Sequence, residues 1–128
     1  MRTPWTAAAA CLCAGTATAA SASEMAISLP DAPAVSQQVV RYRCASGGPG
    51  LGLPSDPFPV LYLNAGENHL AVIEIGGKRL IFANVFAGSG ARYASGRYIW
   101  WDAAGRGASF SVEIPTEQTV QCRRVGLP

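Results

Sequence analysis

The sequence has few charged residues and little imbalance between them. Charged residues make up 14% of its 128 residues, and ten basic against eight acidic side chains give a net charge of +2. Binding to nucleic acid or to anionic lipid depends on clustered positive charge, so this composition argues against both as partners. At about 100 to 200 residues per domain, the length excludes a second folded domain.

Catalytic and metal-binding side chains are also scarce. His69 is the single histidine, and it lies in an apolar segment without the surrounding motif of a hydrolytic triad. One imidazole gives zinc too few ligands, so we expect neither a metal nor another cofactor. The acids of the strand-rich region fall at turns or at positions expected to face solvent: Glu67, Glu74, Asp102, Glu113 and Glu117. We expect no enzymatic activity, and a small hydrolase that uses Asp102 or Glu74 is the least favoured alternative.

The first residues have the three-part layout of a secretory signal peptide, and their apolar run is too short to cross a bilayer. Arg2 precedes an apolar run over residues 7–14, and small residues follow up to Ala20 and Ala22. We predict that residues 1–22 are a signal peptide, cleaved after Ala20 or Ala22, and that the protein is exported to the periplasm.

The exported part is predicted to consist of a leader and one domain. Residues 23–37 contain prolines and show no periodic pattern of apolar residues, which is typical of a flexible leader. Residues 38–128 are predicted to form the domain. An alternative is a lipoprotein, in which Cys11 would be acylated and would hold the protein on a membrane. That alternative fits poorly, because residues 8–10 are alanines rather than the usual large aliphatic residue.

Removal of the signal peptide leaves two cysteines, Cys44 and Cys122. A pair of cysteines in an exported protein suggests one disulfide, and two unpaired thiols are the alternative. The bridge would close most of the domain into one loop, for which the chain-entropy account gives about 4 kcal/mol of stabilisation. It would also tie the first predicted strand to the last.

Short apolar runs alternate with clusters of glycine, proline, asparagine and serine at intervals of roughly 8 to 12 residues, which predicts an all-β fold. The predicted strands are Gln38–Cys44, Pro59–Asn64, His69–Ile75, Arg79–Phe86, a weak Arg92–Tyr93, Arg97–Trp101, Ala108–Ile114 and Thr119–Arg124. Between two of them, Gly76-Gly77 suits a tight hairpin turn. Glycine and proline break any helix in residues 45–57, and Gly47-Gly48-Pro49-Gly50 within this segment indicates a flexible loop. Seven or eight antiparallel strands with linked ends favour a small barrel that hides its edges.

The period of two along a strand also predicts which side chains face the interior. The apolar residues at alternate positions of Ala108–Ile114 are expected to be buried as far as Ile114. Trp100 and Trp101 must point to opposite faces, so one lies in the core and the other is partly exposed, and the sequence leaves open which. Arg123 and Arg124 are expected to be solvated.

One set of motifs resembles a known family. The set comprises Ser89-Gly90-Ala91-Arg92-Tyr93, then Trp101, Gly107-Ala108, Tyr42-x-Cys44 near the start of the domain and Cys122 near its end. Together these motifs resemble the membrane-bound and periplasmic inhibitors of chicken-type (c-type) lysozyme from Gram-negative bacteria. The resemblance covers roughly residues 39–124.

The resemblance implies a small antiparallel β-barrel that blocks an enzyme rather than acting as one. In that family the loop that matches Ser89–Tyr93 inserts into the lysozyme cleft, and its serine hydroxyl hydrogen-bonds a catalytic carboxylate. Ser89, Gly90, Ala91, Arg92 and Tyr93 are therefore candidate lysozyme-binding residues. For Arg92 and Tyr93 the alternative is packing within the barrel.

The family's second motif is a lysine-glycine pair after the tryptophan, and the lysine is absent here. The matching residues are Ala103 or Ala104, and the segment is one residue longer. Arg106, beside Gly107, is the nearest cation and the candidate substitute, although its planar guanidinium is bulkier than an ammonium.

The leading hypothesis is therefore a periplasmic inhibitor that protects the peptidoglycan of its producer from host c-type lysozyme. It needs no small-molecule substrate and no nucleic acid. The main alternative is a binding module on the same barrel for another cell-wall hydrolase or for a glycan, motivated by the missing lysine and by exposed aromatic residues.

Overall fold

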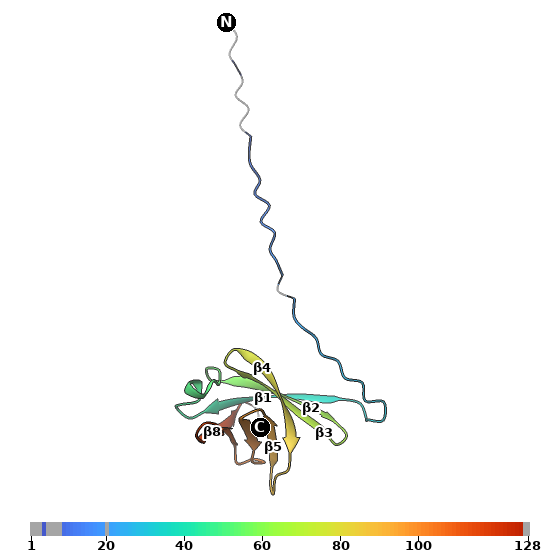
Figure 1. Cartoon of the computed structure of the whole chain (residues 1–128), viewed down its shortest axis with the longest axis vertical. Coiled ribbons are helices and arrows are strands. Elements are labelled where there is room, and N and C mark those ends of the chain that lie inside the picture. The colour runs from blue at the N-terminus through green and yellow to red at the C-terminus, as the bar shows by residue number, and fades with distance from the viewer. Residues whose placement is uncertain (1–3, 5–8, 20, 127–128) are drawn as a thin grey trace.

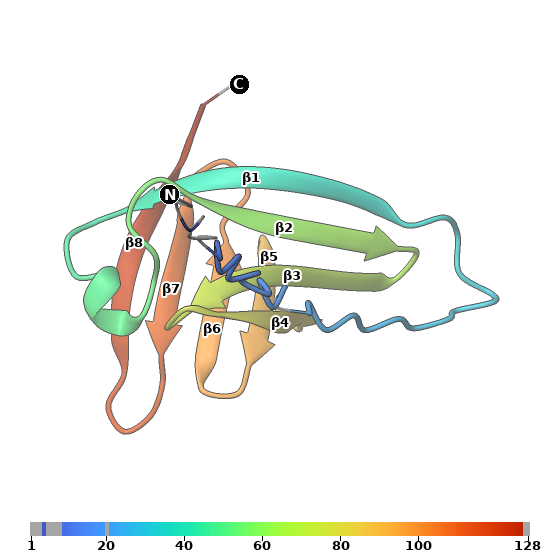
Figure 2. The same ribbon diagram turned by 90° about the horizontal axis from the view of Figure 1, so that it is seen from above.

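The computed structural model describes residue 4, residues 9–19 and residues 21–126, so parts of the predicted signal peptide lie outside the described residues. Strands β1 to β8 form one closed antiparallel barrel in chain order (Figures 1 and 2). Their bounds are β1 Ser36–Cys44, β2 Phe58–Ala65, β3 Asn68–Ile75, β4 Lys78–Val85, β5 Ala91–Ser95, β6 Tyr98–Asp102, β7 Ala108–Val112 and β8 Gln118–Val125. Among the described residues no helix is long and apolar enough to cross a membrane.

The barrel confirms the predicted all-β fold. Closure comes from β1, which pairs with β2 through Ser36–Tyr42 along one edge and with β8 through Arg41–Cys44 along the other. The predicted boundary between leader and domain, at residue 38, falls inside β1. The weakly predicted Arg92–Tyr93 segment is a complete five-residue strand, β5.

The end of β7 differs from the prediction. The strand stops at Val112, and Ile114 is 63% exposed rather than buried. The amide of Glu113 donates to the carbonyl of Arg97 in the β5–β6 turn, and Pro115 has no N–H with which to continue the ladder. The chain therefore leaves the barrel wall before Ile114 can turn inward.

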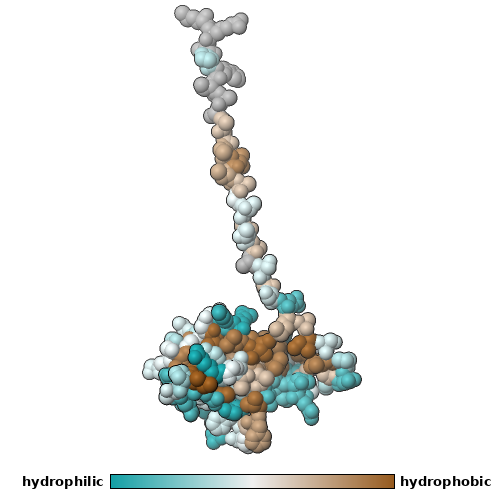
Figure 3. All heavy atoms as spheres, in the orientation of Figure 1, coloured by the Kyte–Doolittle hydropathy of each residue, from teal (hydrophilic) through white to brown (hydrophobic). Residues whose placement is uncertain are grey.

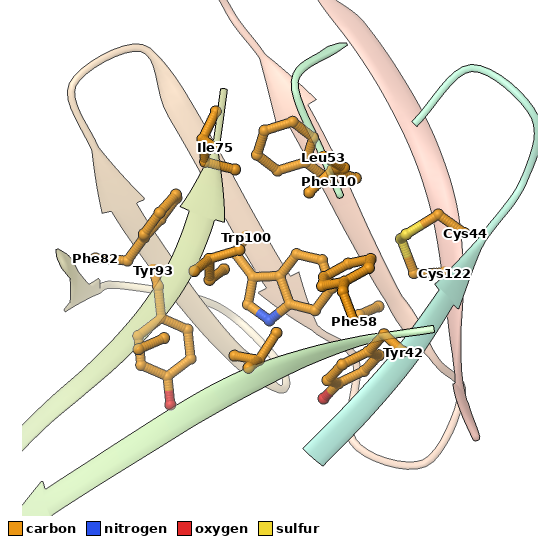
Figure 4. Close-up of a cluster of buried hydrophobic side chains, with 14 of the residues drawn as sticks. Tyr42, Cys44, Leu53, Phe58, Ile75, Phe82, Tyr93, Trp100, Phe110 and Cys122 are labelled. Carbon is orange, nitrogen blue, oxygen red and sulfur yellow. A yellow bond between two sulfur atoms is a disulfide. The ribbon is translucent and has the colours of Figure 1, made fainter. Parts of the chain in front are cut away.

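Trp100 occupies the centre of the core, with no exposed surface, and the other inward side chains surround it (Figure 4). The largest fully buried residues are Trp100, Tyr42, Phe58, Phe82, Phe110, Ile73 and Val60. Tyr42 meets the Trp100 ring edge-on, with centroids 4.8 Å apart, an arrangement that aromatic pairs favour. Trp101, on the opposite face of β6, is 37% exposed. The structure thus assigns Trp100 to the core and Trp101 to the surface.

The disulfide and the hairpin turn agree with their predictions. Cys44 is bonded to Cys122, and the two are register partners in β1 and β8, so the bridge joins the first strand to the last. Gly76 and Gly77 have φ values of 58° and 75°, the left-handed conformation that this turn requires.

Residues 45–57 connect β1 to β2 and contribute to the core. They contain one 3-10 turn, Pro49–Leu51, and they bury Leu53 in the core. The carbonyl of Gly52 accepts the amide of Gly76 at 2.8 Å, which ties the segment to the β3–β4 turn. Leu53 therefore closes one end of the barrel.

Part of the leader lies against the outer wall of the barrel. Met25, Ile27 and Leu29 line a hollow of about 360 Å³ together with residues of β2, β3 and β4, among them Leu63 and Leu70. Apolar side chains accordingly gather where the chain enters the domain (Figure 3). The barrel covers these leader side chains only in part, because Met25 is still 74% exposed and Ile27 70%.

Candidate protein-binding loops

The loop that joins β4 to β5, residues 86–90, carries Ser89 at an exposed position and projects from the lower edge of the barrel in Figure 1. Its backbone is held in place, because the indole N–H of Trp101 donates to the carbonyl of Ser89 at 2.9 Å. Gly90 has a φ of 65°, and a Cβ at this position would collide with the carbonyl oxygen of Asp102. Glycine at this position thus lets the loop lie directly against β6.

The three other predicted residues of this motif lie in β5. Ala91 is half-buried and pairs with Asp102. Arg92 lies on the outer face, 3.4 Å from Glu113 in a partly exposed ion pair of the kind that contributes little to stability. Tyr93 is 5% exposed and packs inside the barrel against Tyr62. Burial raises the pKa of Tyr93, and the negative charge of Asp102 raises it further.

Arg106 lies in the second candidate loop, Ala103–Gly107, which joins β6 to β7. The loop is closed by the amide of Ala103, which donates to the carbonyl of Gly107 at 2.9 Å. Ala104 and Gly105 adopt positive φ values of 46° and 88°, so the chain reverses just before Arg106. The Arg106 side chain is exposed.

The two candidate loops meet at their bases. Ala91 at the start of β5 pairs with Asp102 at the end of β6, so both loops leave the barrel from neighbouring strands. A Cβ on Gly90 would lie only 3.1 Å from the Cα of Ala103. The structure therefore brings Ser89 and Arg106 onto one end of the barrel, on adjacent loops.

Asp102 corrects one prediction about the acids, because it is buried rather than solvated. Its Oδ2 accepts a hydrogen bond from Arg124 at 2.7 Å, and its Oδ1 accepts the amide of Ala104 at 3.2 Å. Arg124 is correspondingly an ion-pair partner rather than a purely solvated charge, and the bond to Asp102 raises its pKa. Burial of Asp102 is possible because charged and polar donors surround it.

A chain of hydrogen bonds runs from the core to this carboxylate. Trp100 Nε1 donates to the Tyr62 hydroxyl at 2.8 Å, and the two tyrosine hydroxyls, Tyr62 and Tyr42, lie 2.8 Å apart. Tyr42 donates to Asp102 Oδ2 at 2.9 Å, so its oxygen accepts the Tyr62 proton. Burial raises the pKa of Tyr42 to about 12 and raises that of Tyr62 as well, so both hydroxyls stay protonated above the pH at which an exposed tyrosine ionises.

Two surface aromatic residues were not identified as site residues from the sequence. Phe86 is 92% exposed and stands at the start of the Ser89 loop. Trp101 shares a hollow of about 390 Å³ with Phe86. In the sequence, Trp101 is only part of the motif set that resembles the family, and Phe86 is predicted to end a strand.

The described residues contain no group of three or more His, Cys, Asp or Glu side chains that could hold a metal ion. His69 Nδ1 instead lies 2.6 Å from the side-chain oxygen of Asn64 on the neighbouring strand. Taken together, the geometry describes a surface formed by two adjacent loops, supported from below by a buried polar network.

Comparison with known proteins agrees with this geometry. Residues 42–117 match the family described as membrane-bound lysozyme-inhibitor of c-type lysozyme. A protein named membrane-bound lysozyme inhibitor of C-type lysozyme from Pseudomonas aeruginosa is 40% identical over 76 residues, which are 59% of this chain and 54% of that protein. A protein of the same name from Cupriavidus necator is 42% identical over 64 residues, 50% of this chain and 45% of that protein.

The chain thus spans about half the length of these two curated relatives. Among solved structures, Pseudomonas aeruginosa MliC in complex with hen egg white lysozyme matches with a TM-score of 0.64 and 31% identity, covering 82% of this chain and 99% of that one. The family match extends from Tyr42 in β1 to Glu117, just before β8, and so includes both candidate loops. The chain belongs to the family of membrane-bound lysozyme inhibitors of c-type lysozyme.

Proposed function

We propose that this protein inhibits c-type lysozyme by inserting the Ser89 loop into the active-site cleft of the enzyme. The observation that carries the proposal is the exposed Ser89 on a backbone fixed by Trp101 and Gly90. A loop already held in its binding conformation loses little conformational entropy on association. The family, and the solved relative in complex with hen egg white lysozyme, support the choice of partner.

The chemistry of the partner suits a serine. Lysozyme works with one protonated carboxylic acid and one ionised carboxylate. A hydroxyl group can donate a hydrogen bond to the carboxylate and accept one from the acid. Ser89 is proposed to occupy the space between the two groups and so to exclude substrate without any covalent step.

Arg106 is proposed to supply the positive charge that the family places on lysine. Its loop lies beside the Ser89 loop, and the exposed guanidinium can bind a carboxylate through two parallel hydrogen bonds. Arg92 is proposed to contact the partner at the edge of the same surface. Tyr93 would act from within the barrel, by holding β5 in place.

The protein acts in this proposal as a binding protein and not as an enzyme. Export to the periplasm remains the proposed location, and membrane attachment through Cys11 is the alternative. Cys11 and Cys13 are both exposed and not in a disulfide. Determining the mass and the N-terminus of the protein purified from cells would distinguish a cleaved soluble form from an acylated one.

The test is the activity of c-type lysozyme on cell walls, titrated with the oxidised domain. Wild type should abolish activity near one equivalent, and Ser89→Ala should weaken inhibition by about 10-fold or more, the effect of removing a hydrogen bond to a charged group. Ser55→Ala, which alters an exposed serine in another loop, is the matched control. Equal inhibition by Ser89→Ala and wild type would remove the role given to Ser89.

A second candidate is a binding module for another cell-wall hydrolase or for a glycan. The absence of the lysine and the two exposed aromatic residues, Phe86 and Trp101, favour it. A folded, disulfide-bonded protein that leaves c-type lysozyme fully active would direct the search to other wall hydrolases.

A further inference from the structure

Phe86 is the most exposed large apolar side chain of the barrel domain, with 92% of its surface open to solvent. It lies directly after β4, three residues before Ser89. Single apolar residues are common on protein surfaces, and exposure by itself would require no explanation. The surroundings of Phe86 distinguish it.

Phe86 forms a ridge between two hollows. On one side a hollow of about 390 Å³ is lined by Phe86, Trp101 and Arg92 with parts of β6 and β7. On the other side a hollow of about 510 Å³ is lined by Phe86, Tyr93 and His69, among others. A partner that covers the Ser89 loop must therefore also cover an aromatic ridge and the depressions beside it.

The fold gains little from this side chain. The alternation of β4 places Phe82 in the core with no exposed surface, and the chain leaves the barrel wall after Val85. Burying a phenylalanine is worth about 1.5–3 kcal/mol, and here that free energy is still available on association. Exposed aromatic side chains near the centre of an interface supply much of its binding energy.

We infer that Phe86 is the main apolar contact between this protein and c-type lysozyme, packing against an apolar wall of the cleft beside the catalytic carboxyl groups. The inference rests on the proposed function and adds an affinity-determining residue to it. Ser89 and Arg106 then provide polar recognition, while Phe86 and the exposed edge of Trp101 provide the apolar area. The neighbouring hollows receive the partner side chains on either side of the ridge.

Another apolar surface lies elsewhere on the barrel and gives the matched control. Val39 is 60% exposed on the outer face of β1, whose pairing partners are β2 and β8 and not the strands of the site. Truncation of Val39 removes exposed apolar surface without altering either candidate loop. An effect specific to the proposed contact should therefore appear at Phe86 and not at Val39.

The experiment measures the dissociation constant for c-type lysozyme by titration calorimetry, with wild type, Phe86→Ala, Phe86→Leu, Val39→Ala and Ser89→Ala. We expect Phe86→Ala to weaken binding by about 10- to 100-fold. Phe86→Leu should restore most of the affinity, and Val39→Ala should match wild type. Circular dichroism melting should place Phe86→Ala within 2 to 3 °C of wild type, about the shift of a surface substitution.

The outcomes separate the two proposals. If Ser89→Ala binds weakly while Phe86→Ala binds as wild type does, the role of Phe86 is wrong and the proposed function stands. If Phe86→Ala binds weakly and Ser89→Ala does not, Phe86 keeps its role and Ser89 loses its own. If folded wild type does not bind lysozyme, both proposals are overturned.

Discussion

Arg124, on the last strand, donates through Nη2 to Oδ2 of Asp102 at a distance of 2.7 Å, and Asp102 marks the base of the Arg106 loop. The same carboxylate accepts the amide of Ala104 within that loop. The side chain of Arg124 is half exposed, whereas that of Asp102 is 9% exposed. A buried acid thus links the end of the chain, the barrel interior and a candidate binding loop.

Replacing Asp102 should lower the stability of the fold. Asp102→Asn keeps the size but weakens the acceptor for Arg124, Tyr42 and the Ala104 amide, so we expect a loss of about 1–3 kcal/mol in the free energy of unfolding. Urea denaturation measures this loss, and Glu67→Gln, at an exposed turn, is the control. A fully stable Asp102→Asn protein would contradict the structural role of the carboxylate.

Stability should fall at alkaline pH. Tyrosine has an ordinary pKa near 10, and burial raises the pKa of Tyr42 to about 12 and also raises those of Tyr62 and Tyr93. The folded state therefore holds protons that the unfolded state has lost, and the stability from these groups is complete below pH 10 and is lost as pH rises to about 12 and above.

Urea unfolding at several pH values between 8 and 12 measures this dependence, with tyrosinate absorbance followed in parallel. We expect the midpoint to decrease with pH above 10 and the buried tyrosines to ionise mainly as the protein unfolds. Free ionisation of all tyrosines near pH 10 in the folded protein would contradict the buried network.

The two glycines beside Ser89 should respond differently to substitution. Gly90→Ala places a Cβ against the Asp102 carbonyl at a φ of 65°, so it should cost about 1–3 kcal/mol of stability and displace the loop. Gly88 has no atom within 4 Å of an added Cβ, so Gly88→Ala should leave stability within about 0.5 kcal/mol.

Their inhibition constants then test the insertion of the loop. If the loop enters a narrow cleft, Gly88→Ala should weaken inhibition even though the domain stays fully stable. Unchanged inhibition by Gly88→Ala would mean that the partner does not approach the backbone closely at that position.

Arg106→Ala should weaken lysozyme inhibition by about 10-fold, if its guanidinium pairs with a carboxylate that becomes desolvated in the complex. Stability should be unchanged, because the Arg106 side chain is exposed. Arg79→Ala, which removes an exposed arginine from β4, is the matched control. Inhibition that is equally insensitive to both substitutions would leave the missing lysine without a substitute.

Most of the barrel could be predicted because its strands are short and alternate clearly, and because glycines mark several turns, as Gly76-Gly77 does between β3 and β4. The burial of Asp102 follows from the same alternation only once the structure shows which tryptophan faces inward. Trp100 faces inward, so Asp102, two residues later, also faces inward. Arg124 likewise follows the buried Cys122 by two residues.

The exposure of Phe86 could not be predicted in this way. The alternation from Phe82 through Asn84 would place Phe86 in the core. The outcome depends on where β4 ends, and the position of that end is set by its pairing with β5 at Val85 and Arg92. This pairing between neighbouring strands is not visible in the alternation of one strand alone.

The hydrogen bond from the Trp101 indole to the Ser89 carbonyl allows the loop to be followed by tryptophan fluorescence. Removal of the predicted signal peptide, which contains Trp5, would leave two indoles: Trp100 is enclosed and Trp101 is 37% exposed. A neutral quencher in solution should therefore quench the fluorescence of Trp101 and not that of Trp100. The fluorescence lifetime of Trp101 can then report whether its contact with the Ser89 loop is kept in a variant, before lysozyme is added.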